Sequence, residues 1–299
     1  MSSILNYGSL NLDYVYGVEH FVKPGETIST ESYVVNCGGK GLNQSIACAK
    51  AGGKVFHAGK IGQEGALLKK ELEKWSVDTA LLVQDEGSNG HAVIQVNAEG
   101  NNCILLFAGS NHRILKEEID VSLDRFGRED CLVLQNEVNN ISYMIEKAYE
   151  KGMYIVFNPS PITKELFEYP LEKVSLFILN EVEGQALSGE EKADKMMQVL
   201  AEKYPEAEVL LTLGEKGSIY CKGTAMIPCK AYPVEAVDTT AAGDTFTGYF
   251  VALRMAGKDV KEALELASAA AAIACTRKGA AASVPELEEV IKYRRTLVF

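Results

Sequence analysis

The sequence lacks any apolar run of 18 residues and any pair of cysteines with C-x-x-C spacing. Without such a run, no membrane-spanning helix is expected. The start, Met1 to Leu12, also lacks the basic and long apolar regions of a signal peptide, so a cytoplasmic protein is expected. The seven cysteines are odd in number and scattered through apolar segments. This pattern favours reduced, buried thiols over a disulfide framework.

Basic charge and histidine are scarce as well. The chain has 30 Lys and Arg against 41 Asp and Glu, a net charge of −11, so neither nucleic acid nor a membrane is an expected partner. The four histidines are dispersed, which argues against a zinc site or a histidine-based nucleophile. No G-x-x-x-x-G-K-[ST] is present, and no G-x-G-x-x-G follows a first strand. The chain is therefore not a P-loop kinase, and a nicotinamide dehydrogenase is the least favoured of the alternatives.

From about residue 117 onward, short apolar runs alternate with amphipathic stretches. Buried parallel strands are expected at 131–135, 154–157, 176–179 and 209–213. Helices are expected at 141–151 and 193–203, and two apolar stripes in the last third predict further helices. The alternation indicates an α/β fold, a three-layer, doubly wound and mostly parallel sheet.

The first third alternates polar and apolar residues at 15–22, 31–35, 91–96 and 102–107, which is typical of a sheet with one solvated face. A Gly-containing loop, 97–101, joins the last two segments as a hairpin. Lys40 to Ala51 is expected to form a helix that Gly52-Gly53 ends. We therefore predict a single domain, 1–299, with the strands of a small β-sheet lid inserted at about 12–37 and 89–109.

The stretch from Ala236 to Phe246 is a turn of small and polar residues that opens into an amphipathic helix. The small residues leave the first backbone N–H groups uncovered, and the helix dipole favours an anion there. Asp244 would lie beside a bound phosphate and could accept a hydroxyl proton. The alternative is structural: Thr239 or Thr240 caps the helix and Asp244 complements its dipole.

Two motifs about 200 residues apart carry a family resemblance. Asp238 to Asp244 matches D-T-x-A-A-G-D, and Gly38 to Gln44 matches G-G-K-G-x-N-Q. Both resemble the ribokinase-like carbohydrate kinases, the PfkB family. The similarity spans nearly the whole chain, including segments 8–13, 23–27, 158–161, 180–183, 212–217 and 276–279.

The resemblance implies a role for each matching residue. Asp244 corresponds to the catalytic base, and Ala241, Ala242 and Gly243 form the anion hole. The sugar is expected to be held by Asn11, Asp13, Gly38, Gly39, Lys40, Asn43 and Glu137. From the residues alone, Asn11 and Asp13 follow an apolar strand at 4–7, where a binding crevice opens, whereas Gly38-Gly39 could be a plain turn and Glu137 a solvated acid.

The nucleotide and its ions have implied positions too. Asn180 and Glu183 match the N-x-x-E motif linked to phosphate and Mg²⁺; they also fit a capping pair at a helix start, and the two roles can hold at the same time. Thr212, Gly214 and Gly217 match ATP-binding positions. A monovalent cation, K⁺, is implied at the positions of Asp238, Thr240, Ala274, Arg277, Gly279 and Ser283.

The resemblance thus implies ATP-dependent phosphorylation of a sugar primary hydroxyl, with D-ribose converted to D-ribose 5-phosphate as the expected reaction. Two departures near the sugar site, Gln63-Glu64 and Asn36-Cys37, leave the sugar open. A fructokinase-like or nucleoside kinase, and a non-catalytic sugar sensor, remain alternatives. Apolar lid positions, including Val15, Val93 and Ile104, predict a homodimer formed through the lid.

Overall fold

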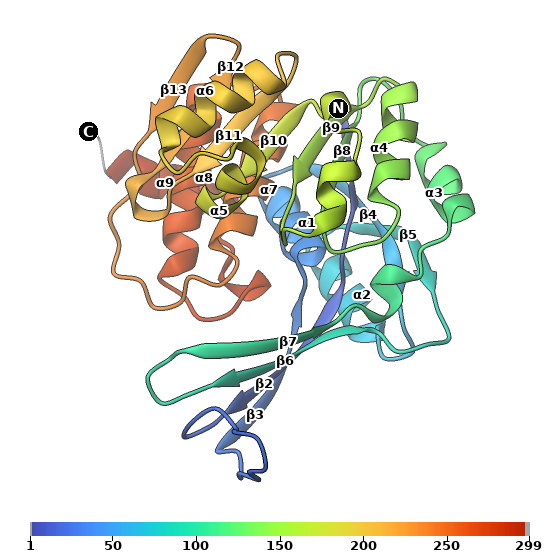
Figure 1. Cartoon of the computed structure of the whole chain (residues 1–299), viewed down its shortest axis with the longest axis vertical. Coiled ribbons are helices and arrows are strands. Elements are labelled where there is room, and N and C mark those ends of the chain that lie inside the picture. Colours follow the sequence, from blue (N-terminus) through green and yellow to red (C-terminus); the bar gives the residue numbers. More distant parts are fainter. Residues whose placement is uncertain (1, 297–299) are drawn as a thin grey trace.

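The computed structural model describes residues 2–296 and contains a nine-stranded central sheet (Figure 1). The strand order is β13-β12-β11-β10-β9-β8-β1-β4-β5, and all neighbouring pairs are parallel except those that include β12. The strands of this sheet are β1 (Ser3–Tyr7), β4 (Lys54–Ile61), β5 (Asp78–Gln84), β8 (Cys131–Gln135), β9 (Tyr154–Asn158), β10 (Leu176–Leu179), β11 (Glu208–Thr212), β12 (Ser218–Lys222) and β13 (Ala225–Cys229).

Helices cover both faces of this sheet. The α-helices are α1 (Lys40–Lys50), α2 (Ala66–Lys74), α3 (Lys116–Leu123), α4 (Ile141–Glu150), α5 (Glu181–Ser188), α6 (Ala193–Lys203), α7 (Ala242–Met255), α8 (Val260–Cys275) and α9 (Leu287–Thr296). Short 3₁₀ turns lie at Gly109–His112, Lys164–Glu168, Leu171–Lys173, Gly214–Lys216 and Ala281–Ser283.

Two hydrophobic cores lie on opposite faces of the sheet. In β8, Cys131 and Val133 belong to the core with α1, α2, α7 and α8, whereas Leu132 and Leu134 belong to the core with α3, α4 and α6. Successive strand residues point to opposite faces, so a strand buried on both sides must be apolar at every position. The expected three-layer, mostly parallel fold is confirmed.

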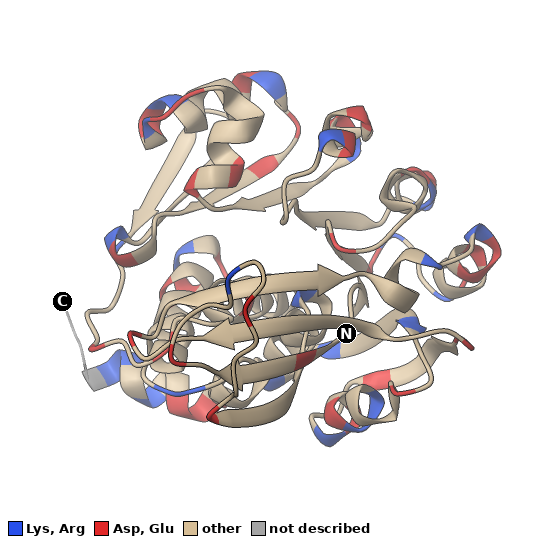
Figure 2. Ribbon diagram, turned by 60° about the horizontal axis from the view of Figure 1, so that its bottom comes forward, with Lys and Arg blue, Asp and Glu red and all other residues tan. Residues whose placement is uncertain are grey.

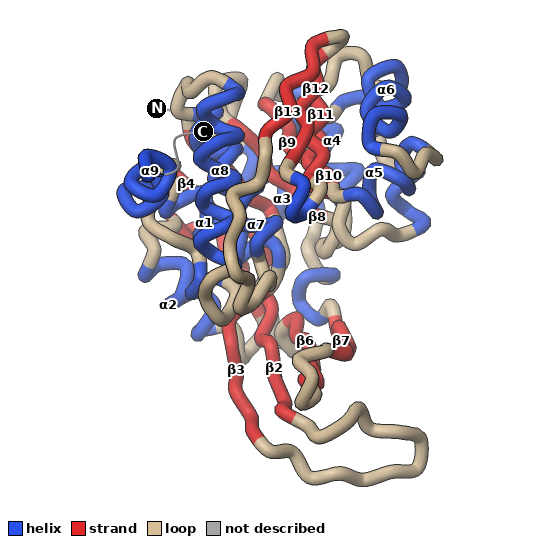
Figure 3. The backbone as a smooth tube through the Cα atoms, turned by 90° about the vertical axis from the view of Figure 1, so that its left-hand side faces the viewer, coloured by secondary structure: helices blue, strands red, loops and turns tan. Residues whose placement is uncertain are grey.

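A separate four-stranded sheet, the lid, extends away from the layered body (Figure 3). Its order is β3-β2-β6-β7, where β2 is Asn11–Gly17, β3 is Ser32–Gly38, β6 is Gly90–Val96 and β7 is Asn102–Phe107. β2 and β6 are parallel, and the other pairs are antiparallel. The lid strands leave the body at the carboxyl end of β1, so the lid stands over one edge of the central sheet.

The predicted strand at 15–22 is wrong in its bounds. β2 begins at Asn11 and ends at Gly17, which pairs with Val96, the last residue of β6. Beyond Gly17 the chain has lost its partner strands, so the alternating pattern no longer forms a strand. Asn11 and Asp13 therefore lie within the first lid strand.

The expected pattern of buried thiols also needs correction. All seven cysteines are free, but Cys103 on β7 is exposed, and Cys37, Cys229 and Cys275 are only half-buried. Figure 2 shows that Lys, Arg, Asp and Glu lie mainly on the outer helices and loops. Among residues 2–296, no helix has the length and apolar character needed to cross a membrane.

Candidate active site

The site lies at the carboxyl ends of the neighbouring strands β1 and β8. The chain extends the sheet in one direction from β1, through β4, and in the opposite direction from β8, through β9. Binding crevices of open α/β sheets form at such points. Helices α1 and α7 meet beside it at very short range. A Cβ atom on Gly248 would lie 2.4 Å from Ala47 Cβ and 2.8 Å from the backbone N of Cys48. Only glycine allows this approach, which brings the first turns of the two helices together.

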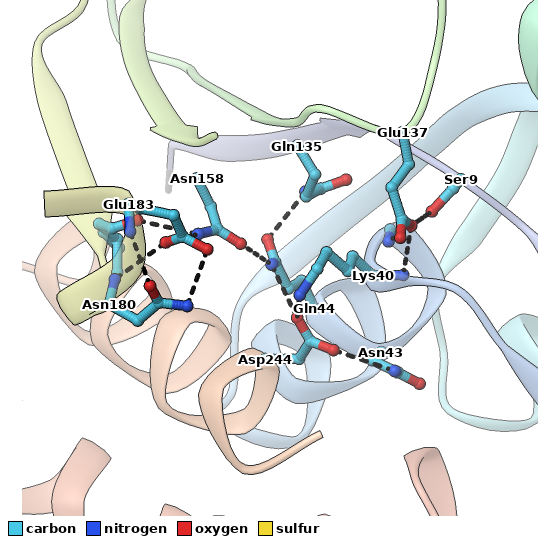
Figure 4. Close-up of polar contacts among 12 residues, drawn as sticks. Ser9, Lys40, Asn43, Gln44, Gln135, Glu137, Asn158, Asn180, Glu183 and Asp244 are labelled. Atoms are coloured by element: carbon cyan, nitrogen blue, oxygen red, sulfur yellow. Dashed lines mark hydrogen bonds and ion pairs between the residues drawn. The ribbon is translucent and has the colours of Figure 1, made fainter. Parts of the chain in front are cut away.

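Asp244, in the first turn of α7, is buried at 6% exposure and held by α1. Its Oδ2 accepts a hydrogen bond from Asn43 Nδ2 at 3.0 Å, and its Oδ1 accepts one from Gln44 Nε2 at 3.0 Å. Lys40 Nζ lies 3.8 Å from Oδ1 (Figure 4). The Asp244 charge is the main cause that raises the Lys40 pKa above its usual value. Sequence positions 40 and 244 are thus brought together.

The start of α7 has the properties of an anion hole. The helix begins at Ala242, and the preceding residue, Ala241, has a positive φ of 58° and no capping side chain. The backbone N–H groups of Gly243 and Asp244 donate no hydrogen bond to any residue in the described part of the chain. A Cβ on Gly243 would meet nothing within 4 Å, so the approach is open. The alternative in which Thr239 or Thr240 caps this helix is wrong.

Glu137 joins the site from the loop after β8. Its Oε2 accepts hydrogen bonds from the backbone N of Lys40, at 3.0 Å, and from Ser9 Oγ. Burial raises the Glu137 pKa, while the charge of Lys40 opposes that shift. Glu137 is therefore not a solvated loop acid: it ties the start of α1 to β8 and lines the same crevice.

Asp13 lies directly over Gly38. A Cβ on Gly38 would be 2.0 Å from Asp13 Oδ2, so no other residue fits beneath this carboxylate. The next residue, Gly39, has a φ of 94°, which favours glycine, and the chain then enters α1 at Lys40. Burial, with a smaller contribution from the charge of Glu137, raises the Asp13 pKa to about 7. Gly38-Gly39 is therefore more than a plain turn.

Asn11 is held from the base of the lid. Asn111 Nδ2 donates to Asn11 Oδ1 at 2.8 Å, and the backbone N of Leu10 donates to Asn111 Oδ1 at 3.0 Å. On the other side, Asn89 Nδ2 donates to the Leu10 carbonyl at 3.0 Å. Gln63-Glu64, where the sequence departs from the family pattern, adjoins these lid-base asparagines: the backbone N of Asn89 donates to Glu64 Oε2 at 3.3 Å.

A cavity of about 720 Å³ lies beside the start of α7, between β11 and α8. It brings together Thr212, Gly214 and Gly217 with Ala242 and Gly243. Apolar side chains on the α8 side and backbone on the other give a slot of the size that ligand pockets commonly have. These predicted nucleotide residues are therefore adjacent to the predicted anion hole.

Asn180 and Glu183 form a reciprocal cap at the start of α5. Asn180 Oδ1 accepts from Glu183 N at 2.9 Å, and Glu183 accepts from the Asn180 backbone N at 2.9 Å and from its Nδ2 at 2.9 Å. Asn158 Nδ2 lies 3.4 Å from Glu183 Oε2. With most of its acceptor positions filled, Glu183 suits a hydrogen bond to a Mg²⁺-bound water better than direct coordination.

Most of the predicted cation residues belong to two connected loops. Asp238 accepts hydrogen bonds from the backbone N of Thr240 and of Gly279, both at 2.9 Å. Burial would raise the Asp238 pKa, but these hydrogen bonds outweigh it and hold the pKa below its usual value. The Arg277 guanidinium pairs with Glu289 on α9, so of Arg277 only the backbone belongs to the loop. Ser283 Oγ donates to the Ala280 carbonyl at 2.7 Å.

Three residues of the crevice had no predicted role. Gln44 lies within the motif that was identified, and Gln135 and Asn158 each end an otherwise apolar strand. The available signal was a polar residue at the carboxyl end of a buried strand, because such positions face the binding crevice. All three side chains are buried and hydrogen-bonded near Asp244.

Comparison with known proteins shows the family to which this chain belongs. Residues 1–287 match the family described as "pfkB family carbohydrate kinase". The chain belongs to the PfkB family of carbohydrate kinases. This PfkB protein is 35% identical to a ribokinase of Haemophilus influenzae over 297 residues, which cover 96% of each chain.

Two solved structures resemble the PfkB protein closely. A ribokinase of Cryptococcus neoformans in complex with ADP has a TM-score of 0.87 and 35% identity, with 98% of this chain and 99% of that chain covered. A ribokinase of Arabidopsis thaliana complexed with ribose and ATP has a TM-score of 0.87 and 28% identity, with 99% of each chain covered. The predicted family and fold are therefore confirmed.

The raised pKa of Asp13 predicts a pH-dependent affinity for a polyhydroxy ligand. A carboxylate that accepts two hydroxyl hydrogens binds best when ionised, and with a pKa of about 7 the ionised fraction falls as the pH drops below 7. We expect kcat/KM for the sugar to fall about tenfold from pH 8 to pH 6. Steady-state assays across this range check the prediction.

The matched control is Asp13→Asn, which should show a lower kcat/KM that changes little between pH 6 and 8. A wild-type profile without an acid limb in this range would contradict the assignment of Asp13. In the wild type and in Asp13→Asn, KM for ATP should change less between pH 6 and 8 than KM for the sugar.

Proposed function

We propose that this protein catalyses ATP-dependent phosphorylation of the primary hydroxyl of D-ribose to give D-ribose 5-phosphate. The observation that carries the proposal is the position of Asp244. Its carboxylate lies beside the open N–H groups of Gly243 and Asp244 and next to the crevice formed by Lys40 and Glu137. The similarity to ribokinases over nearly the whole chain supports the same reaction.

The sugar is held by groups that face the crevice from the lid and from α1. Asp13 accepts hydrogen bonds from neighbouring hydroxyls, and Gly38 and Gly39 let the backbone approach the ring. Asn43 Oδ1 is buried and has no hydrogen-bond partner among the described residues. A buried acceptor without a donor is costly, so a sugar hydroxyl is a fitting partner for it.

Asp244 then accepts the proton of the primary hydroxyl as its oxygen attacks the γ-phosphorus, while the bond to the ADP oxygen breaks. The Gly243 and Asp244 amides donate to the charge that develops on the transferred group. Mg²⁺, held through water near Asn180 and Glu183, would supply further charge neutralisation. Closure of the lid over the crevice excludes water and limits ATP hydrolysis.

Other family substrates remain second candidates. A fructokinase-like or nucleoside kinase shares the Asp244 chemistry, and the Asn36 and Gln63-Glu64 departures lie near the sugar side. A sugar sensor would retain binding without turnover. A panel of D-ribose, 2-deoxyribose, fructose and adenosine, assayed for ADP formation, separates these cases. We expect D-ribose to give the highest kcat/KM, and the absence of turnover with every sugar would contradict the proposal.

Asp244→Asn is expected to retain sugar binding and lose kcat by about 10²–10⁴-fold, because the amide cannot accept the hydroxyl proton. The side chains have the same shape, so the main changes are the loss of the charge that faces Lys40 and of the hydrogen bond that Oδ2 accepts from Asn43. Calorimetry measures sugar binding, and an ADP-coupled assay measures turnover. A variant with near wild-type kcat would remove Asp244 from the reaction.

A monovalent cation is expected to raise activity. The backbone N of Gly279 donates to the Asp238 carboxylate, which joins the two loops shortly before the start of α7 and adds negative charge there. We expect K⁺ to raise kcat several-fold over tetramethylammonium at equal ionic strength, because only the smaller ion fits among carbonyls. Equal rates with both salts would contradict the cation site.

The lid supports a homodimer. On β7, Ile104 and Leu105 are 52% and 68% exposed, and Tyr33 and Val34 on β3 are 54% and 52% exposed. The three positions named from the sequence do not share a face: Val15 and Ile104 lie on the Asp13 side, and Val93 lies on the opposite side. A second lid is the self-complementary cover for such strands.

We therefore expect a dimer in sedimentation velocity at micromolar concentration. Ile104→Lys and Leu105→Lys place a charge on opposite faces of β7, and at least one of them should give a monomer by disrupting the packed face. A wild-type protein that sediments only as a monomer at this concentration would contradict the dimer. A cytoplasmic location stays a prediction from the sequence.

A further inference from the structure

Gln44, which follows Asn43 on α1, is completely buried and contacts the catalytic carboxylate. We propose that Gln44 is a positioning residue that fixes the plane of the Asp244 carboxylate and connects it to the phosphate side of the site through Asn158. This inference rests on the function proposed above. Gln44 cannot touch the sugar or the nucleotide directly, so it must act through its neighbours.

Every hydrogen-bonding group of the Gln44 amide has a partner (Figure 4). Nε2 donates to Asp244 Oδ1 at 3.0 Å and to Asn158 Oδ1 at 3.1 Å. Oε1 accepts from Gln135 Nε2 at 2.8 Å. Four elements, α1, α7, β8 and β9, therefore meet at a single side-chain amide.

The orientation of this amide is determined by backbone carbonyls, which can only accept hydrogen bonds. Asn6 Nδ2 donates to the Gly41 carbonyl at 2.8 Å, so Asn6 Oδ1 faces Gln135 and accepts from its Nε2 at 3.0 Å. Gln135 must then donate to Gln44 Oε1. The Gln44 amide therefore presents its NH₂ group to Asp244. If the amide were flipped, its carbonyl oxygen would face the Asp244 carboxylate, and two acceptors would repel each other.

Asn158 is fixed in the same way. Its Nδ2 donates to the Ile178 carbonyl at 2.9 Å and lies 3.4 Å from Glu183 Oε2. Its Oδ1 is left to accept from Gln44. A continuous path of hydrogen bonds thus runs from Asp244 through Gln44 and Asn158 to Glu183, which caps α5 beside the predicted phosphate side.

On its other side, the Gln44 network continues through Gln135 and Asn6 and ends at an uncharged histidine. Ser45 Oγ accepts from Asn6 Nδ2 at 2.9 Å and lies 2.7 Å from His57 Nδ1. Burial lowers the His57 pKa to about 4, so the ring is uncharged near neutral pH. This network therefore brings no positively charged histidine toward Asp244, and its neutral amides orient the Asp244 carboxylate.

Fixing the carboxylate plane matters because the terminal torsion angle χ2 of an aspartate covers a wide range when no hydrogen bond holds the carboxylate. Asn43 holds Oδ2, but its own Oδ1 has no hydrogen-bond partner among the described residues, so no protein group fixes the Asn43 amide from that side. Gln44 holds Oδ1 from the protein interior. A general base displaced by about 1 Å can lose roughly 100-fold in rate.

The test is Gln44→Met, which keeps the length of the side chain and removes both amide groups. We expect kcat to fall about 10- to 100-fold with KM for sugar and for ATP within threefold of wild type, because only the base is misplaced. Gln198→Met, on the exposed face of α6, is the matched control and should retain wild-type kcat.

A double-mutant cycle with Asp244→Asn separates positioning from general loosening. If Gln44 acts through Asp244, Gln44→Met should change the residual rate of Asp244→Asn by less than threefold. The same fold loss in both backgrounds would overturn the proposal, as would a wild-type kcat for Gln44→Met.

Where Gln44→Met fails to fold, Gln135→Met keeps the contact of Gln44 with Asp244 and removes only its orienting donor. We then expect a several-fold loss of kcat at unchanged KM, and an unchanged kcat would overturn the proposal. A wild-type protein without sugar kinase activity refutes the proposed function and this inference together. An active wild type with normal Gln44 and Gln135 variants refutes the inference alone.

Discussion

The structure depends on the close contact of α1 with α7. Gly248 allows the two helices to approach until a Cβ would collide, and the first turns of both helices then share the Asp244 carboxylate. The contact joins residues 200 positions apart in the sequence. It also places the open amides of α7 near Lys40, so the predicted anion hole, the predicted base Asp244 and Lys40 lie together through helix packing.

The burial that holds Asp244 in place needs polar partners. A charged group out of water is costly unless several donors satisfy it. Here the donors are the neutral amides of Asn43 and Gln44, and backbone carbonyls set the orientation of the Gln44 amide through Asn6 and Asn158. Lys40 supplies a positive charge at 3.8 Å without a direct hydrogen bond. The carboxylate thus remains available on one side to take a proton, while its other contacts fix its position.

Much of the body of the fold could be predicted from the sequence, because strands buried on both faces are apolar throughout. β8 and β10 are examples, and their bounds were predicted correctly. The end of β2 could not be predicted: it depends on where β6 stops, and pairing between distant segments leaves no local signal. The antiparallel strands β12 and β13, at one end of the sheet, have mixed burial, so neither shows the fully buried pattern of β8 and β10.

The candidate site was predictable to a different extent. Asp13, Asp244 and the small residues before α7 were identified because they lie in distinctive motifs. The amides of Gln135 and Asn158 were not, since a single polar residue at the end of a strand resembles ordinary strand termination. Their role appears only when four strands, β1, β8, β9 and β10, and the helix α1 are in place, because each amide is oriented by a partner from another element.

The asparagines at the base of the lid have a consequence for product release. Asn89 and Asn111 both bond to Leu10, and Asn111 also bonds to Asn11, so the chain that enters the lid and the first residue of β2 are held by the same asparagines. A swing of the lid outward must move Asn11 and Asp13 with it, since they belong to β2. With the sugar held by Asn11 and Asp13 as proposed, the motion that opens the lid would also withdraw these two side chains from the phosphorylated sugar.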